Sequence, residues 1–238
     1  MIAGVRSEGS IKKLSAGVPT LTGLDVTSTD PGFTSWLSKE MNTRSVTDVI
    51  CTLGFSPTFI PSDDRELAAA VDYLGTLKLI RAAEAAKLSG RFVLVSSLGI
   101  NATTESARLL NSSLGGVLLQ KGRAEAALRA SRLGWCIVRP GLLLKEVKQG
   151  NVLLGPEDRF IGDASRDREG LGNAVNCASP FLASSGAVCA ATRGQVADVC
   201  VSALTGDPRV FSRRVVEVVA RPDVSPEEGR GYRTIGYS

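Results

Sequence analysis

Four short runs of consecutive apolar residues are the clearest feature of the sequence. They are rich in β-branched residues, end in Gly, Ser, Pro or a charged residue, and lie at 48–53, 91–95, 135–138 and 214–220. Strands that are buried on both faces, as in a parallel sheet, have continuous apolar runs and do not alternate. The pattern therefore predicts four strands of a parallel sheet.

Between these runs, apolar residues recur at spacings of three and four. This spacing predicts amphipathic helices over 64–88, 117–132 and 195–204. Strands that alternate with helices form right-handed βαβ units. We therefore expect the α/β class, with a doubly wound, mostly parallel sheet of the Rossmann type.

The first 46 residues have weaker patterns. The segments 1–5 and 21–26 have the character of short strands, and 10–14 and 33–41 that of short helices.

Two later segments show no regular period. Residues 162–192 are rich in Gly, Ser, Ala and Asn, and we interpret them as an irregular insertion. Residues 222–238 are polar and contain Gly and Pro, so we expect a tail. The expected organisation is one domain over 1–221, followed by the tail at 222–238.

Composition excludes several classes of function. The chain has 238 residues and no histidine, which removes Ser-His-Asp hydrolysis and His-dependent zinc sites, and we expect no metal. The net charge of +4 is scattered, without the basic stripe of a nucleic-acid binder, so no nucleic-acid partner is expected. Five cysteines, an odd number without Cys-x-x-Cys spacing, fit buried reduced thiols. No apolar stretch reaches the roughly 18 residues that would cross a bilayer.

Small residues follow three of the predicted strands. They are Gly54 after the first, Ser96 and Ser97 after the second, and Pro140 and Gly141 after the third. Ligands of doubly wound sheets bind at the carboxyl ends of the strands, where small residues leave room for a flat, extended molecule. Any one of these residues could instead simply make a βα turn.

Three longer motifs resemble the atypical short-chain dehydrogenases. They are 95–99 (VSSLG), 121–131 (KGRAEAALRAS) and 137–141 (IVRPG), with looser matches at 71–80, 195–198 and 215–220. Within that group the chain is most similar to the NADP-binding, dehydrogenase-like component of the chloroplast inner-envelope translocon. The resemblance implies NADP as cofactor and a chloroplast location (stroma, thylakoid or inner-envelope surface), and the sequence shows no transit peptide.

The resemblance also assigns roles to single residues. Segment 3–7 would be the family's second strand, with Arg6 facing the 2′-phosphate of NADP, which a planar guanidinium suits. Asp25 would lie near the adenine ring, Gly54 beneath the adenosine, and Lys121 at the nicotinamide ribose. Ser96, Ser97, Pro140 and Gly141 would complete the cofactor site at the strand ends.

The catalytic tyrosine of the family is replaced. Its Tyr-x-x-x-Lys motif would place the tyrosine four residues before Lys121, where Val117 stands. Carbonyl reduction by hydride needs a proton donor, and a valine side chain has no acidic proton. Ser97 and Lys121 are the candidate catalytic residues if the protein is active, but ordinary dehydrogenase chemistry is not expected.

The glycine-rich phosphate loop is also unmatched. Gly4 and Gly9 do not form Gly-x-x-Gly-x-x-Gly, and only 48 residues precede Val49. Three strands with their helices would need about 70 to 80 residues. One βα unit is therefore missing, and in the strand order 3-2-1-4-5-6 it supplies the central strand. We expect a sequence that continues upstream of Met1, with another segment filling the slot as the alternative.

Three functions remain open. The leading hypothesis is an NADP-binding protein with a regulatory, assembly or structural role as a subunit or assembly partner of a larger chloroplast complex. The second is an NAD(P)H-dependent reductase of a quinone- or flavin-like acceptor. The third is an accessory subunit that has lost cofactor binding. Peripheral membrane association stays open, although no amphipathic anchor is visible.

Overall fold

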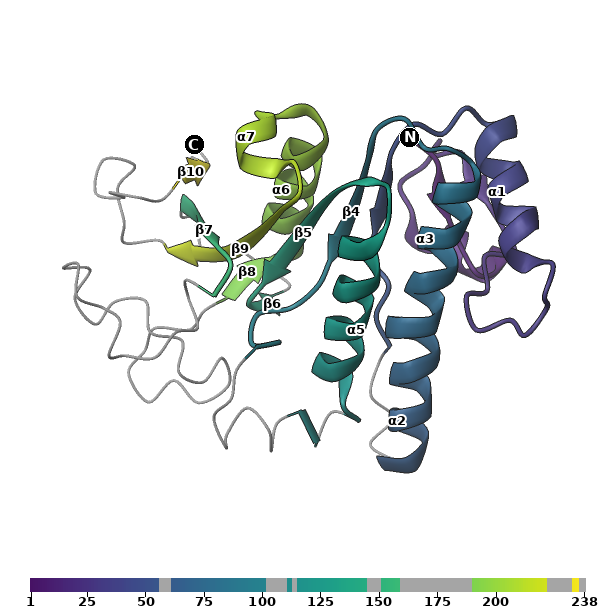
Figure 1. Ribbon diagram of the computed structural model, residues 1–238, viewed down its shortest axis with the longest axis horizontal. Helices are drawn as coiled ribbons and strands as arrows, with labels where there is room; N and C mark the ends of the chain where they lie inside the picture. The colour runs from purple at the N-terminus through teal and green to yellow at the C-terminus, as the bar shows by residue number, and fades with distance from the viewer. Residues whose placement is uncertain are drawn as a thin grey trace.

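A computed structural model describes residues 1–55, 61–101, 111–112, 115–144, 151–158, 190–221 and 233–235. Its centre is a six-stranded sheet with the order β10-β7-β9-β5-β4-β3 (Figure 1). The strands are β3 (Val49–Cys51), β4 (Arg91–Val95), β5 (Gly134–Pro140), β7 (Asn151–Pro156), β9 (Arg214–Arg221) and β10 (Arg233–Ile235).

The four predicted strands, β3, β4, β5 and β9, pair parallel to one another. Their side chains alternate between two cores, so that Phe92 and Leu94 of β4 face one core and Val93 faces the other. All three residues are buried, because helices cover both faces of the sheet. This confirms why the runs are continuously apolar.

The helices form one layer on each side of the sheet. In Figure 1, the continuous helical segment α2 (Pro61–Ala68), η2 (Ala69–Gly75) and α3 (Thr76–Ala85) stands beside α5 (Val117–Ala130). Side chains of α3 and α5 share the first core with α1 (Phe33–Thr43). On the opposite face, α6 (Arg193–Thr205) and the short α7 (Pro208–Phe211) pack on the second core.

The helix boundaries differ slightly from the prediction. The segment expected to end at Leu88 ends at Ala85, because Lys87 takes a left-handed conformation (φ 55°) and the Leu88 amide donates back to the Ala83 carbonyl. Helix α6 begins earlier than expected, since the Thr192 hydroxyl accepts from the Gln195 amide while the Gln195 side chain accepts from the Thr192 amide. This capping box is readable in the sequence as Thr-x-x-Gln.

Among the described residues, the sequence patterns missed four strands. The predicted tail, 222–238, contains β10, which pairs antiparallel with β7, so the sheet continues beyond 221. The end of the predicted insertion, 162–192, contains β8 (Ala190–Thr192), which pairs parallel with β6 (Leu142–Leu144); the part over 162–189 lies outside the described residues. These strands are short or without strong apolar periodicity, and only their pairing makes them strands.

The first 21 residues contain a second, smaller sheet. β1 (Ala3–Gly4) and β2 (Thr20–Leu21) pair parallel as a two-stranded sheet, joined by the 3-10 helix η1 (Glu8–Lys13). The strand expected over 21–26 ends at Leu21, and Gly23 follows in a left-handed conformation (φ 80°). Within the described chain, β1 and β3 belong to different sheets.

Candidate functional site

Lys121 and Asp72 form an ion pair at the carboxyl end of β3. Lys121 Nζ lies 2.8 Å from Asp72 Oδ1 and donates to the Leu53 carbonyl at 3.2 Å. The second carboxylate oxygen, Asp72 Oδ2, accepts from the Phe55 amide at 3.1 Å. The Asp72 side chain is 0% exposed and that of Lys121 is 16% exposed, so the ammonium reaches solvent while its partner does not.

Gly54 lies beside this ion pair. A Cβ atom at Gly54 would come within 3.8 Å of both Lys121 Nζ and Asp72 Oδ1. Cys51, the last residue of β3, is a buried free thiol. Burial raises the pKa of this thiol, so it stays protonated. The structure therefore brings Gly54, Lys121 and Asp72 together.

Val117 occupies the first turn of α5, one turn before Lys121. The helix starts after Gly116, which has a φ of 77°. Residues four apart lie on the same face of a helix, so Val117 and Lys121 share a face as Tyr and Lys do in the family motif. The side chain that would supply a proton is thus replaced at a position that the fold keeps.

The predicted residues after β4 and β5 continue the sheet. The Ser96 amide donates to the Val138 carbonyl at 2.7 Å, and the Leu98 amide to the Pro140 carbonyl at 2.9 Å. The Ser97 hydroxyl donates to the carbonyl of Leu98 at 3.1 Å.

Ser96 is 5% exposed, and its Oγ finds no hydrogen-bond partner among the described residues. A buried hydroxyl without a partner is costly, so this oxygen is a candidate ligand contact. The Gly141 amide donates to the Val218 carbonyl of β9 at 3.2 Å, so its amide is not available to a ligand.

Asp25 and Arg6 lie at the ends of β2 and β1. Asp25 Oδ1 accepts from the amide of Thr27 at 3.0 Å and from its hydroxyl at 2.6 Å. The Thr27 hydrogen bonds lower the pKa of Asp25, with a smaller contribution from the charge of Arg6, so Asp25 is ionised. Arg6 is exposed, and it lies close enough to Asp25 for its positive charge to lower the pKa of that carboxylate.

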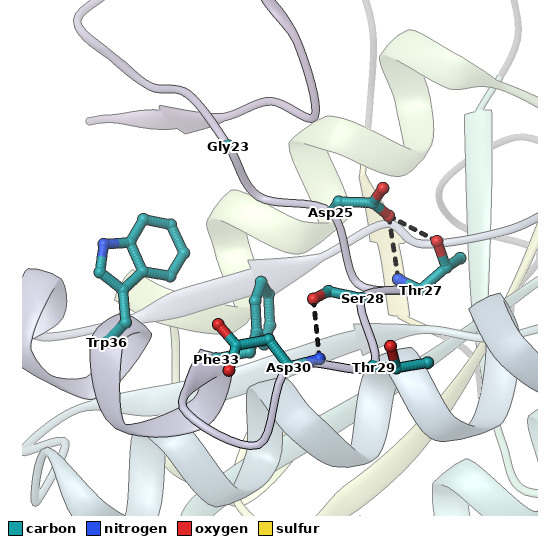
Figure 2. A pocket seen from close by; sticks show the side chains of 8 residues that line it. All are labelled: Gly23, Asp25, Thr27, Ser28, Thr29, Asp30, Phe33 and Trp36. Carbon is teal, nitrogen blue, oxygen red and sulfur yellow. Dashed lines mark hydrogen bonds between the residues drawn. The ribbon is translucent and has the colours of Figure 1, made fainter.

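A hollow of about 510 Å³ lies next to Asp25 (Figure 2). Figure 2 shows Phe33 and Trp36 of α1 on one side and the loop around Asp25, Thr27 and Ser28 on the other. Gly23, Thr29 and Asp30 complete the lining. The combination of an aromatic ring with an ionised carboxylate and hydroxyls can hold a flat base that carries an amino donor.

The helical turn η2 connects the two parts of the candidate site. Gly75, at the end of η2, lies so close to the loop after β2 that a Cβ there would be 2.8 Å from Val26 Cγ2. Lys78 of α3 donates to the carbonyls of Val26 and Ser28 at 2.7 and 2.6 Å. The loop that carries Asp25 is therefore fixed to the helix that carries Asp72.

An ion network behind β5 was not predicted. Arg139, 1% exposed, donates twice to Glu125 (2.9 and 2.8 Å) and once to Glu157 (2.9 Å). Further contacts reach Asp158 (3.1 Å) and Glu217 (3.8 Å). Burial by itself lowers the pKa of Arg139, but the hydrogen bonds and charge of Glu125 and its neighbours raise it overall. This network joins α5, β5, β9 and the turn after β7, a structural role that sequence spacing does not reveal.

Lys121 and the small residues at the ends of β3, β4 and β5 fit one end of a nicotinamide dinucleotide better than its middle. The Lys121 ammonium suits ribose hydroxyls, and the ends of β3, β4 and β5 offer small residues at one edge of the sheet. The glycine-rich turn that holds a diphosphate is not matched in this sequence.

The sequence profile of the NAD(P)H-binding family NAD_binding_10 matches residues 1–176. The chain belongs to this family. The match covers both β1–β2 and the Lys121 site, and it makes the chain an NAD(P)-binding domain of α/β, Rossmann-like fold.

Two plant proteins resemble this NAD(P)H-binding domain in sequence. The Arabidopsis thaliana protein At2g34460, chloroplastic, is 32% identical over 181 residues, which are 74% of this chain and 52% of that protein. Protein TIC 62, chloroplastic, of Oryza sativa subsp. japonica is 39% identical over 118 residues, 48% of this chain and 23% of that protein. The matched part is thus about half of the first relative and less than a quarter of the second.

A solved structure shares the fold. A putative NAD-dependent epimerase/dehydratase from Bacillus halodurans superposes with a TM-score of 0.61 at 23% identity, covering 92% of this chain and 82% of that one. At this identity the likeness concerns the fold.

Among the helices of the described residues, none is both long and apolar enough to span a bilayer.

Proposed function

We propose that this NAD(P)H-binding domain binds NADP and has a regulatory, assembly or structural role in a chloroplast complex, without ordinary dehydrogenase activity. The observation that carries the proposal is Val117, one turn before Lys121 on α5. The ribose-binding lysine is retained and held in place, while the proton donor is replaced by a hydrocarbon. Such a site favours binding over turnover.

The chemistry of the neighbouring side chains agrees with this. NADPH, when bound, would supply a hydride, and reduction of a carbonyl would then need a proton from an acid near the substrate. Lys121 is tied to Asp72, and the Ser97 hydroxyl donates to a backbone carbonyl. A serine hydroxyl without a neighbouring positive charge to lower its pKa is a weak acid.

Arg6 supports NADP over NAD. It is exposed, follows β1, and lies close enough to Asp25 to lower that residue's pKa. A guanidinium in this place can bind the 2′-phosphate with two parallel hydrogen bonds. Asp25 Oδ2, to which no described residue donates, suits the amino group of adenine.

The location and the complex are proposed from the relatives. The plant proteins that match this domain are named chloroplastic, and TIC 62 is among them. We therefore propose that the protein lies in the chloroplast, in the stroma or at a thylakoid or inner-envelope surface, as part of a larger complex. Size-exclusion of native chloroplast extracts checks this, and a protein found only at the size of a free monomer contradicts it.

Calorimetric titration with NADPH and NADH tests the cofactor. We expect the wild type to bind NADPH more tightly than NADH, and Arg6→Ala to weaken NADPH binding about tenfold, corresponding to about 1.4 kcal/mol, with NADH binding unchanged. Arg44→Ala, which removes an exposed arginine paired with Glu40 on α1, is the matched control. Equal losses for both dinucleotides would contradict the assignment of Arg6.

A turnover assay tests the absence of dehydrogenase activity. The purified protein is incubated with NADPH and a panel of carbonyl, quinone and flavin acceptors, and absorbance at the nicotinamide band is followed. We expect oxidation no faster than without protein. Steady NADPH oxidation with a quinone or flavin would favour a reductase that needs no positioned acid.

A further inference from the structure

We infer that Asp72 is a positioning residue that fixes the Lys121 ammonium for the nicotinamide ribose. The inference rests on the proposed NADP binding and adds a residue that the sequence motifs do not assign. It comes from the burial of Asp72, the contacts of its two oxygens and its place in a π-helical turn.

Burial makes the ion pair obligatory. The Asp72 side chain is 0% exposed, and a carboxylate removed from water stays charged only when it is paired and hydrogen-bonded. Lys121 Nζ at 2.8 Å pairs with one oxygen, and the Phe55 amide at 3.1 Å bonds the other. Asp72 thereby fixes both Lys121 and the backbone that follows Gly54.

The contacts of Lys121 leave a donor for a ligand. An ammonium has three N–H groups, and one donates to the Leu53 carbonyl, while the 2.8 Å approach to Asp72 Oδ1 is a charge contact without hydrogen-bond geometry. Lys121 makes no other hydrogen bond to a described residue. Since the Lys121 side chain is 16% exposed and Gly54 adds no side chain beside it, this donor is available at the carboxyl end of β3.

The π-helical turn places Asp72 for this contact. η2 interrupts an otherwise α-helical segment, and such turns are uncommon and occur frequently at functional sites. The neighbouring residue Tyr73 also contacts α5, with its ring centroid 4.0 Å from the Arg123 guanidinium carbon. Two consecutive residues of η2 thus hold the helix that carries Lys121.

A purely structural ion pair would behave differently in one respect. NADPH is an anion, so removal of a carboxylate makes the site more positive and, through charge alone, strengthens binding. Loss of a fixed ammonium geometry weakens it. The direction of the change in Kd therefore separates positioning from charge.

A double-mutant cycle measured by NADPH titration tests the inference. We expect Lys121→Met to raise the Kd about tenfold and Asp72→Ala to raise it about three- to tenfold. The double variant should lose clearly less than the sum of the two single losses, because the main effect of Asp72 passes through Lys121. Asp207→Ala, which removes the same charge at the N-terminus of α7, should leave the Kd unchanged.

The outcomes are distinct. An unchanged or lowered Kd in Asp72→Ala, or additive losses in the double variant, would overturn the role of Asp72 while NADP binding stands. A wild type that does not bind NADPH would overturn the proposed function, and the inference with it. Circular dichroism and thermal unfolding check folding, and if Asp72→Ala lacks a cooperative transition the cycle is run with the isosteric Asp72→Asn.

Discussion

At the scale of single residues, buried charges define the interior of this domain. Asp64, Asp72, Glu125, Arg139 and Glu217 are all nearly inaccessible, in a chain whose core is mainly apolar. Each buried charge is costly alone and acceptable in a network with partners. These residues therefore fix particular contacts between elements, which aliphatic packing alone specifies less sharply.

Arg139 gives the strongest expected effect on stability. Arg139→Ala leaves Glu125 buried without its bidentate partner, and we expect a loss of about 3–5 kcal/mol in the free energy of unfolding. Urea unfolding followed by circular dichroism measures it. Arg209→Ala, whose pair with Asp207 is exposed, should leave the midpoint nearly unchanged. Equal shifts for the two variants would show that burial does not strengthen the Arg139 network.

Glu157 predicts a dependence of stability on pH. Burial raises its pKa, but the hydrogen bond and charge of Arg129, together with Arg139, lower it overall. Because the folded pKa lies below the unfolded value of about 4.3, the stabilisation is complete above that pH and is lost as pH falls through the folded pKa.

Urea midpoints of the wild type and Glu157→Gln, measured between about pH 3 and 7, check this. The difference between them should be constant near neutrality and shrink in acid. A difference that grows as pH falls would contradict the assignment.

At the scale of elements, the segment over 61–85 shows how local pattern and tertiary contact combine. Its apolar spacing predicts a helix, and a helix forms. The turn inside it is π-helical, with Asp72 buried at the end of β3 and Gly75 packed on Val26. The sequence pattern predicts the helix, while the contacts of Asp72 and Gly75 determine where its hydrogen bonding changes from α-helical to π-helical.

Gly75 should tolerate no side chain. In Gly75→Ala, the new Cβ would lie 2.9 Å from Val26 Cβ and 3.2 Å from the Ala70 carbonyl, so we expect a loss of about 1–3 kcal/mol. Val26→Ala in the same chain should recover part of it. Gly194→Ala in α6, whose nearest atom would be 3.9 Å away, is the control and should be neutral or stabilising. Thermal unfolding distinguishes these, and equal effects at both glycines would contradict the close approach.

At the scale of the whole molecule, the interrupted sheet is the main feature. β3 is the last strand of the six-stranded sheet, and Ile50 at its centre is 36% exposed. The β1–β2 pair stands apart and has only two residue pairs in its ladder. Helix α1 and the loop after β2 connect it to the rest through α3 (Figure 1).

Hydrogen exchange should reflect this division. We expect the amides of β1, β2 and β3 to exchange faster than those of β4 and β5, because β4 and β5 are each hydrogen-bonded to a neighbouring strand on both sides. NADPH should slow exchange around Asp25 and at Leu53–Phe55, because both segments belong to the candidate site. Exchange of β1 as slow as that of β5 would show that the small sheet is not separately labile.

The sequence by itself determined the four parallel strands of the main sheet, the helices between them, and the sharing of one helix face by Val117 and Lys121. Continuous apolar runs and helical spacing are properties of the local sequence, and they do not depend on contacts between residues that are far apart in the chain. The capping box at Thr192 could have been read as well.

Tertiary structure alone decided which charges meet. Asp72 and Lys121 are far apart in sequence, and neither spacing nor composition indicates that the π-helical turn directs one carboxylate to the end of β3. The same holds for Arg139 and for β7 and β10, whose strands exist through their partners. Burial makes these pairings necessary, because a charge or an amide withdrawn from water must find a partner, and only the fold decides which one is near.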